Sequence, residues 1–154
     1  MSAAHDLHQE ALRTREPRAL PLRFFADDRG WSLMNLFVGV LNGGQCNYSI
    51  LYSGVYKAWH RHATQTDFWV VPQGNAKVGV VDEENGKQWT FFLGEKAPQL
   101  LIIPPGLWHG LTTTGNAPCG LLYYVNQEYD HKAPDEERRP HDGFPAFRWD
   151  VEHK

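Results

Sequence analysis

Three histidines and one aspartate have the spacing of a metal site or an acid–base site. His60 and His62 are two residues apart, so on a strand both side chains leave the same face. Asp67 follows after a short turn, and His109 follows the turn sequence Pro-Pro-Gly at residues 104–106. Three imidazoles and one carboxylate suit Fe(II), Mn(II), Ni(II) or Zn(II). The pattern therefore predicts a divalent transition-metal site made of His60, His62, Asp67 and His109.

Short β-strands are expected to position these residues. From Leu22 onward the chain consists of short segments rich in β-branched and aromatic side chains, separated by Gly, Pro, Asn and Asp. Many short strands with turn residues between them are typical of an antiparallel sandwich or barrel. A hairpin turn is predicted at Asn85-Gly86. The predicted strands are residues 31–38, 45–51, 56–62, 67–72, 76–81, 88–93, 100–103, 110–113 and 120–125.

The two ends of the chain have a different character. The N-terminal end is polar, and a short helix is predicted over residues 5–13, before Pro17. The C-terminal end is charged and interrupted by prolines, with a short helix expected over 134–139 and a solvated charged face over 135–139. These features divide the chain into an N-terminal arm (1–21), a β-barrel (22–128) and a C-terminal tail packed on the barrel (129–154).

Composition excludes several classes of partner. The 154 residues suffice for one domain with a core, and a net charge of −3 with a pI near 6.2 gives no basic surface for nucleic acid or anionic membrane. No apolar run approaches the roughly 20 residues of a membrane span, and residues 1–21 lack the apolar segment of a secretory signal. Cys46 and Cys119 show no CxxC spacing and are expected to be reduced, mostly buried thiols. We therefore expect a cytoplasmic protein.

The spacing of these residues resembles the paired motifs of the cupin superfamily. Residues 54–74 match G-x5-H-x-H-x4-E-x6-G, with Asp67 in place of the usual Glu. Residues 94–113 resemble the second motif, G-x5-P-x-G-x2-H-x3-N, with Thr113 in place of Asn and a looser leading spacing. This resemblance implies an all-β fold, a double-stranded β-helix also called a jelly-roll cupin barrel.

A longer resemblance, over roughly residues 27–150, is to the dTDP-4-dehydrorhamnose 3,5-epimerase family and related nucleotide-sugar isomerases. Asp28-Arg29-Gly30, Gln45-Cys46-Asn47-Tyr48-Ser49 and Gly54-Val55-Tyr56-Lys57-Ala58-Trp59-His60 match family segments. So do Pro105-Gly106-Leu107-Trp108-His109-Gly110 and the stretch from Leu122-Tyr123-Tyr124 to Tyr129-Asp130, and Arg148-Trp149-Asp150 resembles the family's closing segment.

The resemblance implies roles for individual residues. His60 falls on the family's general base and Tyr123 on its general acid, in a reaction that removes a proton next to a C4 ketone and returns it on the opposite face. Arg29 would contact the nucleotide diphosphate, and Lys57 keeps the charge of the family's Arg but loses its bidentate fork. The implied catalytic residues are His60 and Tyr123, and the implied substrate-binding residues are Arg29, Gln45, Asn47, Lys57, Trp108 and Tyr129.

The chain also departs from the epimerase pattern. Asp67 replaces a Lys that would neutralise a developing enolate, and His62 is an addition. The Asp that orients the base in the family lies in a segment beyond residue 154. A divalent cation held by the three histidines and Asp67 would take the place of the missing Lys. A ligated imidazole nitrogen cannot also be the free base, so with metal bound Tyr123 becomes the proton carrier.

These observations predict an epimerase or isomerase of a nucleotide-linked keto-sugar, without an organic cofactor. A homodimer is expected, in which N-terminal residues pair with the neighbour's sheet and cover an exposed strand edge. Three alternatives stay open: a metal-dependent cupin dioxygenase, a non-catalytic small-molecule-binding cupin, and a metal-free enzyme in which Asp67 orients His60. Tyr123 is equally well explained as a core aromatic with a satisfied hydroxyl.

Overall fold

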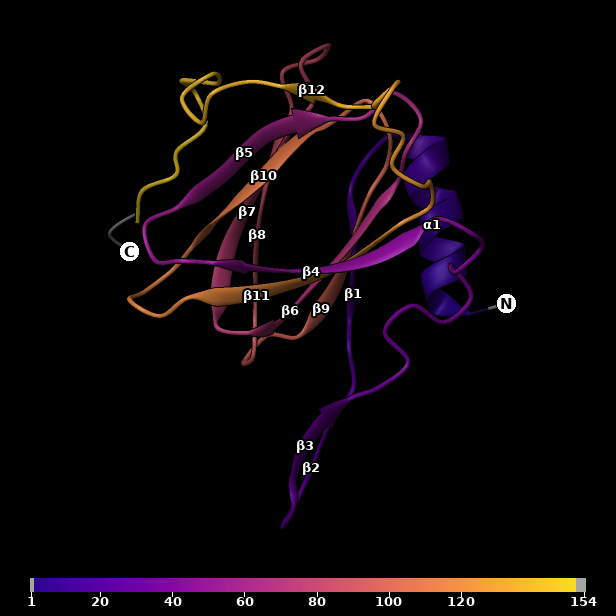
Figure 1. The fold of residues 1–154 in the computed structure, drawn as a ribbon, viewed down its shortest axis with the longest axis vertical. Helices are drawn as coiled ribbons and strands as arrows, with labels where there is room; N and C mark the ends of the chain where they lie inside the picture. The colour runs from indigo at the N-terminus through magenta and orange to yellow at the C-terminus, as the bar shows by residue number, and fades with distance from the viewer. Residues whose placement is uncertain (1, 152–154) are drawn as a thin grey trace.

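A computed structural model, which describes residues 2–151, shows two five-stranded antiparallel sheets packed face to face (Figure 1). The first sheet has the strand order β1-β9-β6-β11-β4, and the second has the order β12-β5-β10-β7-β8. This arrangement confirms the antiparallel sandwich predicted from the sequence. The elements are α1 (Ala3–Thr14), β1 (Arg18–Pro21), β2 (Phe24–Asp27), β3 (Gly30–Leu33), β4 (Gln45–Leu51), β5 (Tyr56–Arg61), β6 (Asp67–Gln73), β7 (Asn75–Val81), β8 (Gln88–Gly94), β9 (Gln99–Ile103), β10 (Trp108–Thr113), β11 (Cys119–Val125) and β12 (Glu137–Arg138).

Hydrophobic side chains from both sheets fill the space between them. Trp69 and Leu101 come from the first sheet, Val78 and Leu111 come from the second, and all four are buried. Because side chains alternate along a strand, each of these strands sends every second residue into this central core. The β7–β8 hairpin turns at Asn85-Gly86 as predicted, and Gly86 takes the positive φ of 73° that the turn needs.

Helix α1 covers the outer face of the first sheet. Ser2 caps the helix by accepting a hydrogen bond from the backbone N–H of His5, and Arg15 ends it in the left-handed conformation. Its buried Ala11 packs with Phe68 and Val70, so β6 is buried on both faces. The helix predicted over residues 5–13 is therefore confirmed, with a few more residues at its ends. No helix within residues 2–151 has the length and apolar character needed to cross a membrane.

The C-terminal tail covers the outer face of the second sheet. Phe147 packs with Trp59, Val81 and Trp108 in a separate buried cluster. A Cβ atom at Gly79 would lie 2.5 Å from the Phe147 ring, so a glycine at this position lets the tail approach the sheet. The tail is thus part of the packed structure along this face.

Two predicted elements are wrong in type or extent. The strand predicted over residues 31–38 ends at Leu33, because Asn35 takes a positive φ of 59° and the chain then turns. The helix predicted over residues 134–139 contains instead the short strand β12. The backbone of Arg139 exchanges two hydrogen bonds with Trp59, of 2.8 and 2.9 Å, so this segment extends the second sheet beyond β5.

The β2–β3 hairpin projects away from both sheets (Figure 1). Its aromatic side chains are about half exposed, and Phe24 stacks on Trp31 at 5.5 Å between ring centroids. Strand β1, within the predicted N-terminal arm, pairs with β9 of its own chain. The division of the chain at residues 21 and 128 stays a prediction.

The two cysteines lie in different environments. Both are free thiols, and Cys119 is buried as expected. Cys46 is exposed, because it lies on the outward-facing side of β4, at the edge of the first sheet. The expectation of burial is thus correct for Cys119 and wrong for Cys46.

Candidate functional site

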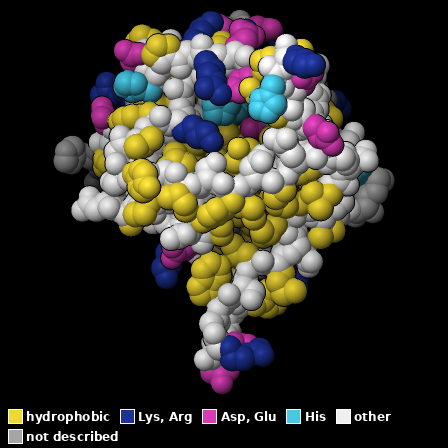
Figure 2. Space-filling view, viewed as in Figure 1, with side chains coloured by type: hydrophobic (Ala, Val, Ile, Leu, Met, Phe, Trp, Pro, Cys, Tyr) yellow, Lys and Arg dark blue, Asp and Glu magenta, His cyan; other side chains and the backbone are white. Residues whose placement is uncertain are grey.

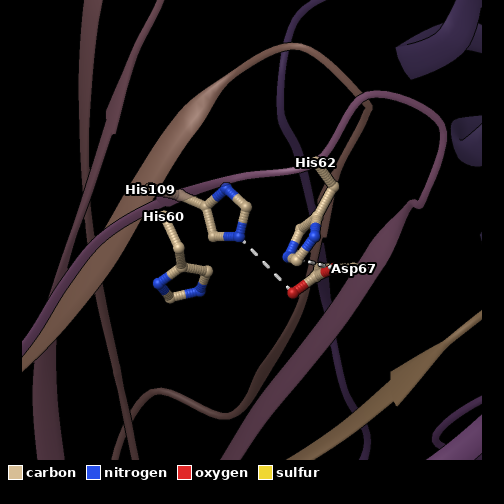
Figure 3. Close-up of side chains that lie close together, drawn as sticks. All are labelled: His60, His62, Asp67 and His109. Atoms are coloured by element: carbon tan, nitrogen blue, oxygen red, sulfur yellow. Dashed lines mark ion pairs between the residues drawn. The ribbon is translucent and has the colours of Figure 1, made fainter. Parts of the chain in front are cut away.

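Two neighbouring strands and the turn after them bring together the four predicted metal ligands. His60 on β5 and His109 on β10 are direct cross-strand partners, and their ring centroids lie 4.3 Å apart. His62 follows the end of β5, and Asp67 begins β6 after the intervening turn. One ligand atom from each of the four residues lies within 4.8 Å of the others. The predicted cluster is therefore formed in the structure (Figure 3).

The Pro-Pro-Gly turn ties the two halves of the cluster together. Gly106 takes a φ of 86°, which favours glycine, and its N–H donates to the carbonyl oxygen of His62 at 2.8 Å. The chain then enters β10, where His109 faces the space between the sheets. The turn thus fixes the segment before His109 against the segment that carries His62.

Backbone carbonyls orient two of the imidazoles. Nδ1 of His109 donates to the carbonyl oxygen of Leu107 at 2.9 Å, and Nδ1 of His62 donates to the carbonyl oxygen of Asp135. A carbonyl oxygen only accepts hydrogen bonds, so each ring carries a proton on Nδ1 and turns Nε2 toward the cluster. These Nε2 atoms lie 3.4 Å (His109) and 3.8 Å (His62) from the Asp67 carboxylate (Figure 3).

The Asp67 carboxylate is itself held by two donors. Gln65 Nε2 donates to Oδ1 at 2.7 Å, and Trp69 Nε1 donates to Oδ2 at 3.0 Å. Burial would raise the pKa of Asp67, but the interaction with His109, followed by smaller contributions from His62 and His60, outweighs it and lowers the pKa below its usual range. Asp67 is therefore a fixed carboxylate anion at neutral pH.

The imidazoles and the carboxylate together suit a positive charge. Burial, followed by the proximity of His109, lowers the pKa of His60 well below its ordinary value of 6.5, so this ring is neutral at neutral pH. Nε2 of His109 is buried and has no hydrogen-bond partner among the residues that the structure describes. Imidazole lone pairs that face a carboxylate need a cation or a proton between them. The cluster thus has the donor set and the charge for a divalent cation.

A cavity of about 250 Å³ opens beside the cluster. Figure 2 shows histidine in a hollow at the upper end of the molecule, with Lys or Arg side chains near its edge. His60, His62 and Asp67 lie in the cavity wall. The other predicted residues that line the cavity are Gln45, Lys57, Tyr123 and Tyr129.

Lys57 and Tyr123 lie together in this wall, from opposite sheets. The Lys57 Nζ atom is 5.3 Å from the centroid of the Tyr123 ring. Burial lowers the pKa of Lys57, an effect that the nearby carboxylates of Glu136 and Asp67 oppose. The ring of Tyr123 also packs against the central core, so this side chain has both the predicted cavity position and a packing role.

Three predicted substrate-binding residues do not line the cavity. Trp108 is 1% exposed and points to the opposite face of the sheet, where the guanidinium carbons of Arg61 and Arg139 lie 4.7 and 4.3 Å from the centroid of its ring. Arg29 lies at the turn of the projecting hairpin and pairs with Asp27. Asn47 lies beside Tyr123 in the β4–β11 register but outside the cavity lining. The position of Trp108 gives it a packing role in place of the predicted ligand contact.

The C-terminal tail supplies a part of the site that the sequence did not predict. Asp135, Glu136 and Arg138 line the cavity, although residues 135–139 were predicted as a solvated charged face. The Asp135 carboxylate accepts hydrogen bonds from the turn between His62 and Asp67, which corrects that prediction. Gln65, which holds Asp67, was missed as well. The sequence indicated this contact only by placing Gln65 two residues before Asp67.

Comparisons with known proteins show which family the chain matches. Residues 25–137 match the family described as polysaccharide biosynthesis C-terminal domain. The chain is 36% identical over 115 residues to the spore coat polysaccharide biosynthesis protein SpsL of Bacillus subtilis, which covers 71% of this chain and 76% of that protein. It is 42% identical over 101 residues to a Haloferax volcanii protein named "Probable low-salt glycan biosynthesis epimerase Agl13", which covers 62% of this chain and 65% of that protein.

A solved structure is also similar along most of the chain. The dTDP sugar isomerase of Desulfovibrio desulfuricans G20 superposes with a TM-score of 0.77 at 26% identity and covers 86% of this chain and 90% of that one. These matches confirm the jelly-roll cupin fold predicted from the sequence. They also confirm the predicted resemblance to sugar epimerases and isomerases.

Proposed function

The chain belongs to the family of polysaccharide biosynthesis C-terminal domains, and from this premise we propose that it is an epimerase or isomerase of a nucleotide-linked keto-sugar. Relatives named as a glycan biosynthesis epimerase and a dTDP sugar isomerase support the reaction class. The observation that carries the proposal is that a neutral histidine, a tyrosine and a lysine line one cavity, and that the histidine belongs to a cluster with a carboxylate and two further histidines.

In the proposed reaction, a proton leaves the carbon next to the ketone and is returned on the other face. His60 on β5 and Tyr123 on β11 extend from opposite sheets into the cavity, so a sugar ring between them would have a proton carrier on each side. The neutral state of His60 is the one that a general base requires. Lys57 would then neutralise negative charge on the substrate or on the enolate.

We also propose that His60, His62, Asp67 and His109 bind a divalent transition metal, Fe, Mn, Ni or Zn. The donor set supports this assignment, because Nε2 of His62 and Nε2 of His109 both face the Asp67 carboxylate. When bound, such a cation would polarise the ketone and stabilise an enolate. A coordinated His60 would not be available as a base, and Tyr123 would then be the proton carrier in the cavity.

Substrate binding is proposed for the polar residues of the cavity wall. Gln45 and Lys57 lie on strands that flank the cavity, and Tyr129 lies on the tail beside it. The Gln45 side chain accepts a hydrogen bond from the backbone N–H of Tyr129 at 3.1 Å, which links the first sheet to the tail. No organic cofactor is part of the proposal, and the cytoplasmic location predicted from the sequence stays a prediction.

A homodimer in which the β2–β3 hairpin packs on a second copy is also part of the proposal. The hairpin leaves Phe25 and Trp31 about half exposed, and Tyr48 and Ile50 are exposed on the edge strand β4. Figure 2 shows hydrophobic side chains on the lower half of the sandwich and on the hairpin. In such a dimer, Arg29 would contact the substrate of the neighbouring copy. Light scattering should give twice the chain mass for the parent protein and the chain mass for Trp31→Glu, whereas a monomeric parent would contradict the dimer.

Solvent exchange tests the proposed reaction. The protein is incubated in D2O with a dTDP-linked 4-keto-6-deoxyhexose, and NMR follows deuterium incorporation next to the ketone. Oxygen consumption is measured in parallel. We expect incorporation in the parent protein without oxygen uptake, and strongly reduced incorporation in His60→Gln and Tyr123→Phe. Oxygen uptake with oxidised product would favour the dioxygenase, and tight binding without incorporation would favour a binding protein.

A further inference from the structure

We propose that Asp135 is a positioning residue that fixes His62 in a single orientation and tautomer and thereby couples the C-terminal tail to the site. The proposal rests on the proposed function only in that the site uses His62. Asp135 lies in the tail between β11 and β12, more than 70 residues from His62 in the sequence. It touches the site by both its side chain and its backbone.

The Asp135 carboxylate holds the turn that joins β5 to β6. Oδ1 accepts from the backbone N–H of Ala63 at 2.7 Å. Oδ2 accepts from the N–H groups of Thr64 and Gln65 at 2.9 and 3.0 Å, and from the Thr64 hydroxyl at 2.7 Å. Burial would raise the pKa of Asp135, but these hydrogen bonds outweigh it and lower the pKa below its usual range. The turn is therefore anchored by one ionised side chain.

This turn carries both groups that shape one side of the cluster. His62 immediately precedes the turn, and its Nδ1 donates to the backbone carbonyl oxygen of Asp135. Its third residue is Gln65, whose side chain donates to Asp67 Oδ1 at 2.7 Å. Asp135 therefore acts on His62 directly and on Asp67 through Gln65.

His109 and His62 differ in where the hydrogen-bond partner of Nδ1 comes from, and this difference isolates the role of Asp135. His109 Nδ1 donates to Leu107, which is two residues away on the same segment, so its tautomer is fixed locally. The tautomer of His62 depends on a partner that the tail must bring into place. Partners that hold the second nitrogen of a ligating imidazole typically change metal affinity about 10- to 100-fold when removed.

The same tail segment also forms part of the cavity wall. Tyr129, Glu136 and Arg138 line the cavity on either side of Asp135, and β12 pairs with the strand that carries His60. A ligand that shifts this segment would therefore also shift the hydrogen-bond partner of His62.

The test compares Asp135→Ala and Asp135→Asn with the matched control Asp142→Asn, an exposed acid elsewhere in the tail. In metal-free protein labelled with 15N-histidine, long-range 1H–15N spectra at pH 7.5 report the tautomer of His62. Asp135→Ala keeps the backbone carbonyl oxygen that accepts from His62 Nδ1 but removes the carboxylate that holds the turn after His62 against the tail. We therefore expect an Nδ1–H ring in the parent and the control, and a mixture with the Nε2–H form in Asp135→Ala. Asp135→Asn keeps one carbonyl oxygen and should lie between them.

Cobalt(II) titration, followed by its visible absorption bands, gives the second readout. We expect affinity to fall about 10- to 100-fold in Asp135→Ala, less in Asp135→Asn, and to stay unchanged in the control. An unaltered His62 tautomer in both Asp135 variants would overturn the proposal. If the parent protein binds no cobalt, the metal part of the proposed function fails, while the tautomer spectra still decide the role of Asp135. If Asp135→Ala does not fold, Asp135→Asn supplies both readouts.

Discussion

The space between the two sheets has a hydrophobic region and a polar region, and the same strands build both. On β10, His109 and Leu111 face the same space two residues apart, and on β6, Asp67 precedes Trp69 in the same way. Both regions are buried, yet one is packed with apolar side chains and the other opens into a cavity. The site therefore lies where the inward-facing side chains of β6 and β10 change from apolar to polar. Because the same strands are held by the packed hydrophobic region, that region sets the positions of His109 and Asp67.

The largest effect should come from removing the proposed proton carrier in the polar region. His60→Gln replaces the imidazole by a neutral amide that cannot act as a base, so we expect solvent exchange of the substrate proton to slow about 10²- to 10⁴-fold. NMR in D2O measures the rate. An exchange rate within about threefold of the parent would remove His60 from the chemistry.

The opposite change truncates a side chain in the hydrophobic region. Leu101→Ala removes a fully buried side chain and should lower the free energy of unfolding by about 2–5 kcal/mol. Urea unfolding followed by tryptophan fluorescence measures this loss. Below the unfolding transition, the exchange rate should stay close to that of the parent. A slowed rate with unchanged stability would mean that the two regions are not separable in this way.

A smaller effect is expected from pH, through His60. The unfolded chain takes up a proton near the ordinary pKa of 6.5, whereas folded His60, whose pKa is lowered, does not. Stability is therefore fully present above pH 6.5 and falls as pH drops below it, by at most about 1.4 kcal/mol per pH unit from this group. Urea unfolding of metal-free protein at pH 7.5, 6.5 and 5.5 tests this. In His60→Gln the fall should be shallower, and an identical slope would contradict the assignment.

The smallest effect should come from loosening one support of the carboxylate. Gln65→Met keeps the length of the side chain but removes its hydrogen bond to Asp67 Oδ1, so we expect a loss of about 0.5–1.5 kcal/mol in the free energy of unfolding. The same urea unfolding assay applies, with Gln127→Met as a control on the cavity wall that does not contact Asp67. Gln127→Met loses its own hydrogen bond to Thr64, so the parent protein is the reference for the decisive comparison. A stability of Gln65→Met equal to that of the parent would mean that Gln65 does not support Asp67.

Local pattern was sufficient to predict strands β4 to β11 and the cluster of His60, His62, Asp67 and His109. His60 and His62 share a face because strand side chains alternate, and a short turn returns Asp67 to them. The same alternation could have placed Trp108, since a residue adjacent to the inward-facing His109 must point outward. The resemblance to a family motif, by contrast, gave Trp108 a ligand contact that its position does not support.

Contacts between distant segments could not be read from the sequence. The charges of residues 135–139 are typical of a solvated surface, and only the folded chain brings Asp135 to the turn after His62. Likewise, β12 forms as a strand because the backbone of Arg139 pairs with Trp59, a partner that no local pattern indicates. The tail's part in the site depends on such long-range pairing.

Metal content compared between the parent protein and His62→Ala tests most directly whether the polar region is a cation site. Both proteins are purified untagged, reloaded with Fe, Mn, Ni or Zn, desalted, and measured for metal per chain alongside circular dichroism. We predict close to one ion per chain in the parent, and little in His62→Ala with an unchanged spectrum, because one of four ligands is lost. No bound metal in the parent after reloading would contradict the cation site and leave the metal-free pair His60 and Tyr123.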